Sequence, residues 1–207
     1  MSRRLIVLLI AISAVLFVLL AFLAHNNTPL PGDEAIARWL QGFQAQFLDS
    51  VLRTVSFLAE TWPTVITVAI LALILLIRRR FLEMILIIAV PTVVELLNYL
   101  LKMIVDRPRP GADLTGGGLS FPSGHATYAM AFFGFLFFLT PRFIKNTVAA
   151  RITQAVLALL IVLGGAARIY VGKHWPSDIL GSYLFGGTVL LVAALIYKSI
   201  RKEEDIA

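Results

Sequence analysis

The sequence predicts an all-α polytopic membrane protein, with a bundle of six transmembrane helices and one helical segment at the extracytoplasmic interface. Two observations predict this fold. Hydrophobic residues make up 59% of the 207 residues and charged residues only 14%, which is outside the range of soluble domains. The apolar residues also gather in long runs separated by short basic clusters, as they do in polytopic membrane proteins. We therefore expect a single membrane-embedded domain over residues 1–207.

The first apolar run, residues 5–24, follows Arg3 and Arg4 and is long enough to cross a hydrocarbon core of roughly 30 Å. A cleaved signal peptide usually has a shorter apolar region of about 7–15 residues and a small-residue cleavage site, which is absent before His25. We therefore expect a retained first helix. The six expected spans are residues 5–24, 61–77, 81–105, 123–140, 152–170 and 179–197.

Between the first two spans, residues 33–57 have apolar side chains at three- and four-residue spacing, which makes one apolar helix face. Pro29, Pro31 and Gly32 break the chain before this segment. We expect an amphipathic helix on the membrane surface, and the alternative is a cap packed over the bundle. The apolar positions are Ile36, Trp39, Leu40, Phe43, Phe47, Val51 and Leu52.

The third span is unusual because it contains ionisable residues, which at membrane depth tend to face a bundle interior or a water-filled cavity. Glu83 follows the arginine triplet at residues 78–80, so we expect a solvated end residue. Glu95 and Asn98 lie one turn apart on one face. A structural hydrogen bond to a neighbouring helix is the favoured interpretation for them, and a direct catalytic role is the alternative.

The distribution of basic residues predicts the orientation in the cell membrane. Six spans put both termini on one side, and the loops on that side hold 11 of the 18 lysines and arginines, against seven in the other loops. Cytoplasmic loops carry the excess, so both termini are expected in the cytoplasm. The segments 25–60, 102–125 and 168–178 then share the extracytoplasmic face. Basic clusters that act as topology signals give no reason to expect a nucleic-acid partner.

Three polar clusters are expected at that face, and each could contact an anion. Lys102 ends the third span, and Arg109 follows on a segment stiffened by Pro108 and Pro110. An arginine can bind phosphoryl oxygens in bidentate fashion, and a lysine supplies a point charge. A basic cluster at a helix end more often reflects snorkelling side chains or a topology signal. This cluster on its own is therefore weak evidence for an anion site.

The second cluster, Pro122-Ser123-Gly124-His125, begins the fourth span. Ser123 is a good N-cap, free N–H groups at a helix start bind anions, and Gly124 allows close backbone approach. The alternative to an anion-binding site is a helix cap with a histidine that has no functional role.

The third cluster contains Arg168, His174 and Asp178. Pro176 suits a first helical turn and places Asp178 about one turn from His174, where its carboxylate can orient the imidazole for nucleophilic attack.

Together, Lys102-x6-Arg109-Pro110, Pro122-Ser123-Gly124-His125 and Arg168-x5-His174-x3-Asp178 resemble the three-part signature of the type-2 phosphatidic acid phosphatase family. That superfamily also includes bacterial acid phosphatases and vanadium haloperoxidases. The resemblance covers residues 102–178, and the six-span layout resembles its membrane branch. One departure is Ala167, where the family usually has a serine, so a hydroxyl contact near the phosphate is expected to be missing.

The resemblance implies a membrane lipid phosphate phosphatase that needs no metal and no cofactor. His174 would be the nucleophile that forms a phosphohistidine, Asp178 would orient it, and His125 would protonate the leaving oxygen. The implied phosphate ligands are Lys102, Arg109, Arg168, Ser123 and Gly124. The absence of cysteine excludes thiolate metal sites and disulfides, and the outer loops contain no zinc-like cluster.

Phosphatidic acid, phosphatidylglycerophosphate and polyprenyl diphosphate all fit as lipid substrates entering from the bilayer. The alternatives within the class are an undecaprenyl-diphosphate phosphatase and a lipid A phosphatase or phosphotransferase. An anion transporter and a haloperoxidase are the alternatives from other classes. No obligate protein partner is indicated.

Overall fold

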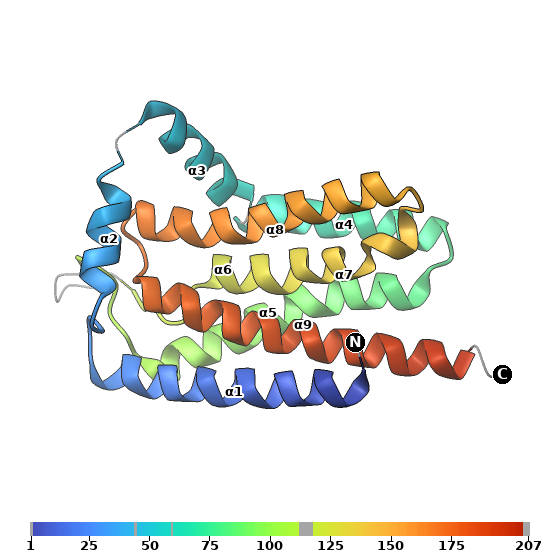
Figure 1. The fold of residues 1–207 in the computed structure, drawn as a ribbon, viewed down its shortest axis with the longest axis horizontal. Helices are drawn as coiled ribbons and strands as arrows, with labels where there is room; N and C mark the ends of the chain where they lie inside the picture. Colours follow the sequence, from blue (N-terminus) through green and yellow to red (C-terminus); the bar gives the residue numbers. More distant parts are fainter. Residues whose placement is uncertain (1, 44, 59, 112–117, 205–207) are drawn as a thin grey trace.

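The computed structural model describes residues 2–43, 45–58, 60–111 and 118–204, and the regular elements among them are all helices (Figure 1). One isolated bridge joins Pro108 to Leu119. The elements are α1 (Arg3–Asn26), α2 (Asp33–Gln41), α3 (Gln46–Leu58), α4 (Thr61–Ile77), α5 (Phe81–Val105), α6 (Gly124–Tyr128), the π-helical turn η1 (Ala129–Phe133), α7 (Gly134–Phe143), α8 (Thr147–Tyr170) and α9 (Pro176–Glu204).

Five helices among the described residues are long and apolar enough to cross a membrane, and the number becomes six if α3 and α4 count as one bent span. The bend between those two helices is 58°, and α4 by itself has 17 residues. The elements α6, η1 and α7 together form the span Gly124–Phe143. The predicted all-α membrane bundle is confirmed.

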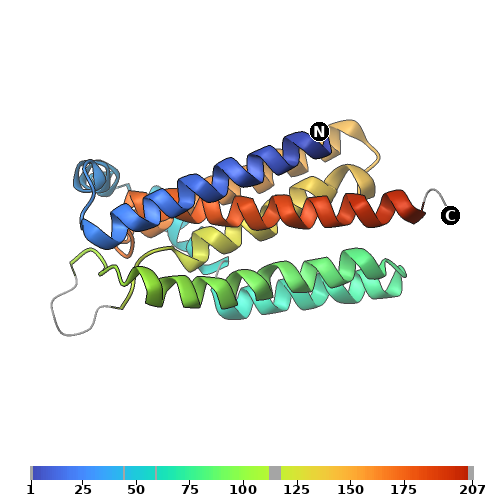
Figure 2. The same cartoon turned by 90° about the horizontal axis from the view of Figure 1, so that it is seen from below.

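The helices run roughly along one long axis, so the molecule has two distinct ends (Figures 1 and 2). The start of α1 and the end of α9 lie at one end, together with the turns that join α4 to α5 and α7 to α8. Helix α2 lies across the opposite end. Helix α1 packs along α9, and α4 packs along α5. The segments that follow α1, α5 and α8 therefore meet at the α2 end.

The expectation of one amphipathic helix over residues 33–57 is corrected, because the segment forms two helices, α2 and α3, separated near Gly42. Glycine is a poor helix former, which favours a break at this position. Helix α2 caps the bundle: Ala37 is buried in a small apolar cluster with Ile169 and Ile179, and Gln41 donates a hydrogen bond to the carbonyl oxygen of Ile169 at 2.9 Å. Helix α3 packs against α8.

Glu83 also differs from expectation, because its side chain is buried, not solvated. Its Oε1 accepts hydrogen bonds from the Tyr197 hydroxyl at 2.9 Å and from Arg201 Nη2 at 2.8 Å. Both partners come from α9, so this carboxylate joins α5 to α9 at the end that holds the termini. The arginine triplet beside Glu83 in the sequence contributes neither of these hydrogen bonds.

Candidate active site

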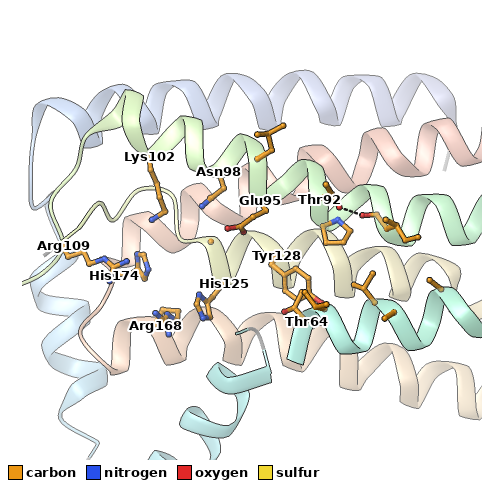
Figure 3. Close-up of a pocket in the computed structure, with 18 residues that line it drawn as sticks. Thr64, Thr92, Glu95, Asn98, Lys102, Arg109, His125, Tyr128, Arg168 and His174 are labelled. Carbon is orange, nitrogen blue, oxygen red and sulfur yellow. Dashed lines mark hydrogen bonds between the residues drawn. The ribbon is translucent and has the colours of Figure 1, made fainter. Parts of the chain in front are cut away.

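A cavity of about 810 Å³ opens between the helices near the α2 end, and its polar end collects side chains from all three sequence clusters (Figure 3). Helix α5 supplies the lysine, α6 and the loop after α8 supply the two histidines, and α8 and the loop after α5 supply the two arginines. These residues are Lys102, His125, His174, Arg168 and Arg109. Residues up to 72 positions apart in the sequence, from 102 to 174, therefore line one cavity.

A single backbone carbonyl holds the first two cations side by side. Lys102 Nζ donates a hydrogen bond to the carbonyl oxygen of Leu119 at 2.8 Å, and Arg109 Nε donates to the same oxygen at 3.4 Å. The bridge between Pro108 and Leu119 aligns the two arms of the loop that carries this carbonyl. Because the partner is a neutral oxygen, both positive charges stay available to an anion.

His174 is 2% exposed, and its Nδ1 lies 3.5 Å from Oδ2 of Asp178 one turn later. The two side chains are thus as close as the spacing predicts, at ion-pair distance and without an aligned hydrogen bond. Burial lowers the pKa of His174 to about 4, because desolvation of the charged imidazolium outweighs the opposing effect of Asp178. The ring is thus neutral near pH 7, and Nε2 is left as the nitrogen able to attack a substrate.

Arg168 is 5% exposed, and its Nη1 donates a hydrogen bond to the Ser56 hydroxyl at 2.8 Å. Its Nε has no hydrogen-bond partner among the described residues. Beside Arg168 on the same wall of the cavity, Nε2 of His125 lies 3.2 Å from Oε1 of Glu60, which precedes α4 (Figure 3). Ser56 and Glu60 lie outside the three sequence clusters.

Ser123 occupies the N-cap position of α6, but its hydroxyl makes no capping hydrogen bond. The side chain is fully buried, its Oγ has no partner among the described residues, and its backbone N–H donates to the Ser182 hydroxyl at 2.8 Å. Gly124 does line the cavity. A Cβ atom at position 124 would lie 3.3 Å from Nδ2 of Asn98, so a side chain there would crowd that amide.

Arg107 is a third residue at the site, after Ser56 and Glu60, to which the sequence pattern assigns no role. Its guanidinium is fully buried between two carboxylates: Nη2 donates to Asp33 at 2.8 Å, and Nη1 donates to Asp178 and, at 2.8 Å, to the Ser177 hydroxyl. Ser177 is also tied to Asp33, because its backbone N–H and its hydroxyl donate to that carboxylate at 2.9 and 2.7 Å. No local pattern links Asp33 to Arg107, which lies 74 residues further along the chain.

Beyond its polar end, the cavity continues between α4 and α5 as an apolar channel (Figure 3). Asn98 accepts a hydrogen bond from the Thr127 hydroxyl at 3.4 Å, in agreement with the expected structural role. The same expectation is not met for Glu95, which lines the cavity and makes no hydrogen bond or ion pair to any described residue. The apolar lining consists of Val65, Val68, Ala69, Ala72, Ile88, Pro91 and Leu96.

The described residues contain no group of three histidine, aspartate or glutamate side chains that could hold a metal ion. The cavity instead concentrates two imidazoles and three cationic side chains. Such a site can bind a phosphoryl group, attack its phosphorus with a nitrogen and exchange a proton with the leaving oxygen.

Comparison with known proteins gives matches across most of the chain. The family model described as the PAP2 superfamily matches residues 80–202. Phosphatidylglycerophosphatase B from Bacillus subtilis (strain 168) is 27% identical over 173 residues, which cover 82% of this chain and 85% of that protein. Lipid A 1-phosphatase from Rhizobium etli is 36% identical over 114 residues, covering 49% of this chain and 45% of that protein.

Among solved structures, the transmembrane PAP2-type phosphatidylglycerolphosphate phosphatase from Bacillus subtilis superposes with a TM-score of 0.81 and 24% sequence identity. The superposition covers 92% of this chain and 96% of that one, so the two proteins share a fold.

Proposed function

We propose that this chain, which belongs to the PAP2 superfamily, is an integral-membrane lipid phosphate phosphatase that works through His174. The family resemblance predicted from the three motifs is confirmed. The prediction of a lipid phosphatase agrees with both relatives, which are phosphatases acting on phosphatidylglycerophosphate and on lipid A by name.

One observation carries the proposal: the cationic end and the apolar channel belong to the same cavity. A lipid phosphate has the same two parts, an anionic head and a hydrocarbon tail. Lys102, Arg109 and Arg168 would neutralise the head, and the channel between α4 and α5 would receive the beginning of the tail. The unpartnered Ser123 hydroxyl and the backbone at Gly124 are further candidates for contact with phosphoryl oxygens.

In the first half of the reaction, Nε2 of His174 attacks phosphorus while Asp178 holds the other ring nitrogen. The bond between phosphorus and the lipid oxygen breaks, and His125 donates a proton to that oxygen, which releases the lipid alcohol. The three cations stabilise the negative charge on the equatorial oxygens of the transition state.

In the second half, water attacks the phosphohistidine. His125, now neutral, accepts a proton from the water as the new phosphorus–oxygen bond forms. The phosphorus–nitrogen bond breaks, which returns His174 to its starting state and releases inorganic phosphate. This scheme uses only side chains of the chain itself and needs no metal ion or cofactor.

We propose a glycerolipid phosphomonoester as the preferred substrate, with phosphatidylglycerophosphate first and phosphatidic acid next. Support comes from the relative that aligns over 85% of its own length, a phosphatidylglycerophosphatase by name. A polyprenyl diphosphate, as for an undecaprenyl-diphosphate phosphatase, and lipid A are the competing substrates.

Phosphate release from purified, detergent-solubilised protein tests the proposal, with phosphatidylglycerophosphate, phosphatidic acid, undecaprenyl diphosphate and lipid A as substrates and His174→Ala as the control. We expect release by the wild type from at least the first two. Absence of release from every lipid, combined with anion flux in liposomes, would replace the proposal with a transporter. Vanadate-dependent bromide oxidation without lipid turnover would replace it with a haloperoxidase.

We further propose that residues 1–207 form one domain whose active site faces the extracytoplasmic side, with both termini in the cytoplasm. Two features support this orientation. The loops after α5 and α8, which carry Arg109 and His174, lie at the end opposite the start of α1 and the end of α9, and the arginine triplet lies in the turn at the terminal end (Figure 1). Reporter fusions within residues 111–118 test it. A cytoplasmic signal from such a fusion would invert the assignment.

A further inference from the structure

Glu60 contacts the ring of His125 from outside the three motifs. Its Oε1 lies 3.2 Å from Nε2 of His125, and the two side chains are 49% and 22% exposed. The groups interact at ion-pair distance without an aligned hydrogen bond. Glu60 stands at the N-cap position of α4 in extended backbone, yet it makes no side-chain capping bond, so its carboxylate is free to face the imidazole.

His125 and Glu60 line different cavities. His125 lines the large cavity, whereas Glu60 lines a second pocket of about 250 Å³. The second pocket also contains Arg53, Ser56, Arg168 and Lys173, so it is strongly basic. Because Glu60 does not line the large cavity, a lipid phosphate could occupy that cavity while the carboxylate stays against the ring.

The remaining charges around His125 are mostly positive. Arg168 from α8 and Lys173 from the following loop act on it electrostatically, and Lys102, Arg109 and the neutral His174 share its cavity. Glu95 lies further along the same cavity, and Glu60 is the described carboxylate in direct contact. A proton on the His125 ring therefore has one close anionic partner among several cations.

We propose that Glu60 is a positioning residue for His125, which orients the imidazole and stabilises its protonated form while the ring gives a proton to the lipid oxygen and later takes one from water. This inference rests on the proposed function. Glu60 neither gives nor takes a proton in this scheme, so the proton balance of the two half-reactions is unchanged. A carboxylate beside each histidine, Asp178 for His174 and Glu60 for His125, then fixes both rings.

The test is Glu60→Gln, which keeps the shape of the side chain and removes its charge, with Glu34→Gln as the matched control. Glu34 pairs with Arg38 on the exposed face of α2 and makes no hydrogen bond or ion pair to either histidine. We expect kcat on a lipid phosphate to fall by about 10- to 100-fold in Glu60→Gln, with KM changed less than about 2-fold, because acid–base steps affect the transition state. Glu34→Gln is expected to match the wild type.

Two further measurements separate positioning from general damage. In Glu60→Gln/His125→Ala, kcat should equal that of His125→Ala alone, because a residue that acts through His125 has nothing left to influence. The first-turnover release of nitrophenolate from p-nitrophenyl phosphate should be much less affected by Glu60→Gln than release of a lipid alcohol, because nitrophenolate leaves without a proton. Unchanged thermal unfolding of the variant would show that its fold is intact.

The outcomes distinguish this inference from the proposed function. Suppose that the wild type hydrolyses lipid phosphates, and that Glu60→Gln matches it or the double variant has a kcat tenfold below that of His125→Ala. The proposed role of Glu60 is then wrong, and the phosphatase assignment stands. If the wild type hydrolyses none of them, the phosphatase assignment fails first.

Discussion

One carboxylate oxygen of Asp178 contacts Arg107, and the other contacts His174. Oδ1 accepts a hydrogen bond from Nη1 of Arg107, and Oδ2 lies 3.5 Å from Nδ1 of His174. Since Oδ2 also accepts the backbone N–H of Trp175 at 2.8 Å, the carboxylate is fixed from three directions. The orientation of the proposed nucleophile is therefore linked, through Arg107 and Asp33, to the helix that caps the bundle.

Removing the charge of Arg107 should destabilise the fold. Arg107→Met keeps much of the side-chain volume but leaves the buried carboxylates of Asp33 and Asp178 without their cation. Breaking a buried ion pair from one side costs about 3–5 kcal/mol, so the variant should unfold at a clearly lower temperature in detergent. Arg38→Met is the control, because its pair with Glu34 is 72% and 54% exposed and should contribute at most about 1 kcal/mol. Equal unfolding midpoints for the two variants would contradict the structural role.

His174→Ala should abolish lipid phosphate hydrolysis and leave the fold intact. The variant lacks the nitrogen that forms the covalent intermediate, so neither turnover nor labelling of the protein with radioactive phosphate is possible. Labelling is measured after an alkaline quench, because phosphohistidine is labile in acid, and circular dichroism checks the fold. Near-normal turnover in His174→Ala would remove the nucleophile assignment.

The buried state of His174 predicts how activity depends on pH. The pKa of His174 is lowered to about 4, so the ring stays neutral and nucleophilic through mildly acidic solution. The acid limb of kcat/KM, which reports the free enzyme, should fall only as the pH drops through about 4. On the alkaline side, the rate should decline because His125 has to donate a proton. A flat profile through the neutral and alkaline range would count against the role of His125.

The same residue predicts how stability depends on pH. An unfolded histidine has a pKa near 6.5, about 2.5 units above that of folded His174, so the unfolded state binds more protons between these values. The free energy of unfolding should therefore fall as the pH drops from about 6.5 to about 4. Below about pH 4, the contribution of His174 should no longer change. His174→Asn should reduce the slope in unfolding experiments over this range. An unchanged slope would mean that His174 is not buried in the neutral form.

Filling the apolar channel should affect long-chain substrates selectively. Ala72→Phe puts a ring into the space between α4 and α5, whereas Leu73→Phe enlarges a neighbouring side chain of α4 that is 57% exposed and does not line the cavity. We expect Ala72→Phe to raise KM for a long-chain phosphatidic acid about 10-fold, roughly the effect of one or two methylene groups lost from an apolar pocket. KM for a short-chain analogue should change little. Equal effects on both chain lengths would place the tail elsewhere.

Metal removal should leave the enzyme active. The proposed nucleophile is an imidazole, and Lys102, Arg109 and Arg168 supply the positive charge that a metal ion provides in other phosphatases. Turnover measured after dialysis against EDTA should equal that of the untreated protein. Loss of activity with EDTA and recovery on adding a divalent ion would contradict the proposed mechanism.

Local patterns in the sequence determined much of this molecule. Long apolar runs predict the spans, because the hydrocarbon core requires about 20 apolar residues in a continuous helix. The spacing of His174 and Asp178 predicts their contact, because one helical turn brings positions i and i+4 together. The predicted topology puts Lys102, Arg109, His125 and Arg168 on one membrane face, and the family resemblance makes them one site. The structure places all four on one cavity with His174.

The tertiary structure decided the contacts between elements that are distant in the sequence. The pairs Arg107 with Asp33, His125 with Glu60, and Glu83 with Arg201 join residues whose separation follows no helical period. Which charged side chain becomes buried depends on how each helix is rotated and on how the bundle ends are capped. Hydropathy records only that a segment is apolar, so the partners that orient the two histidines appear only when the helices are packed together.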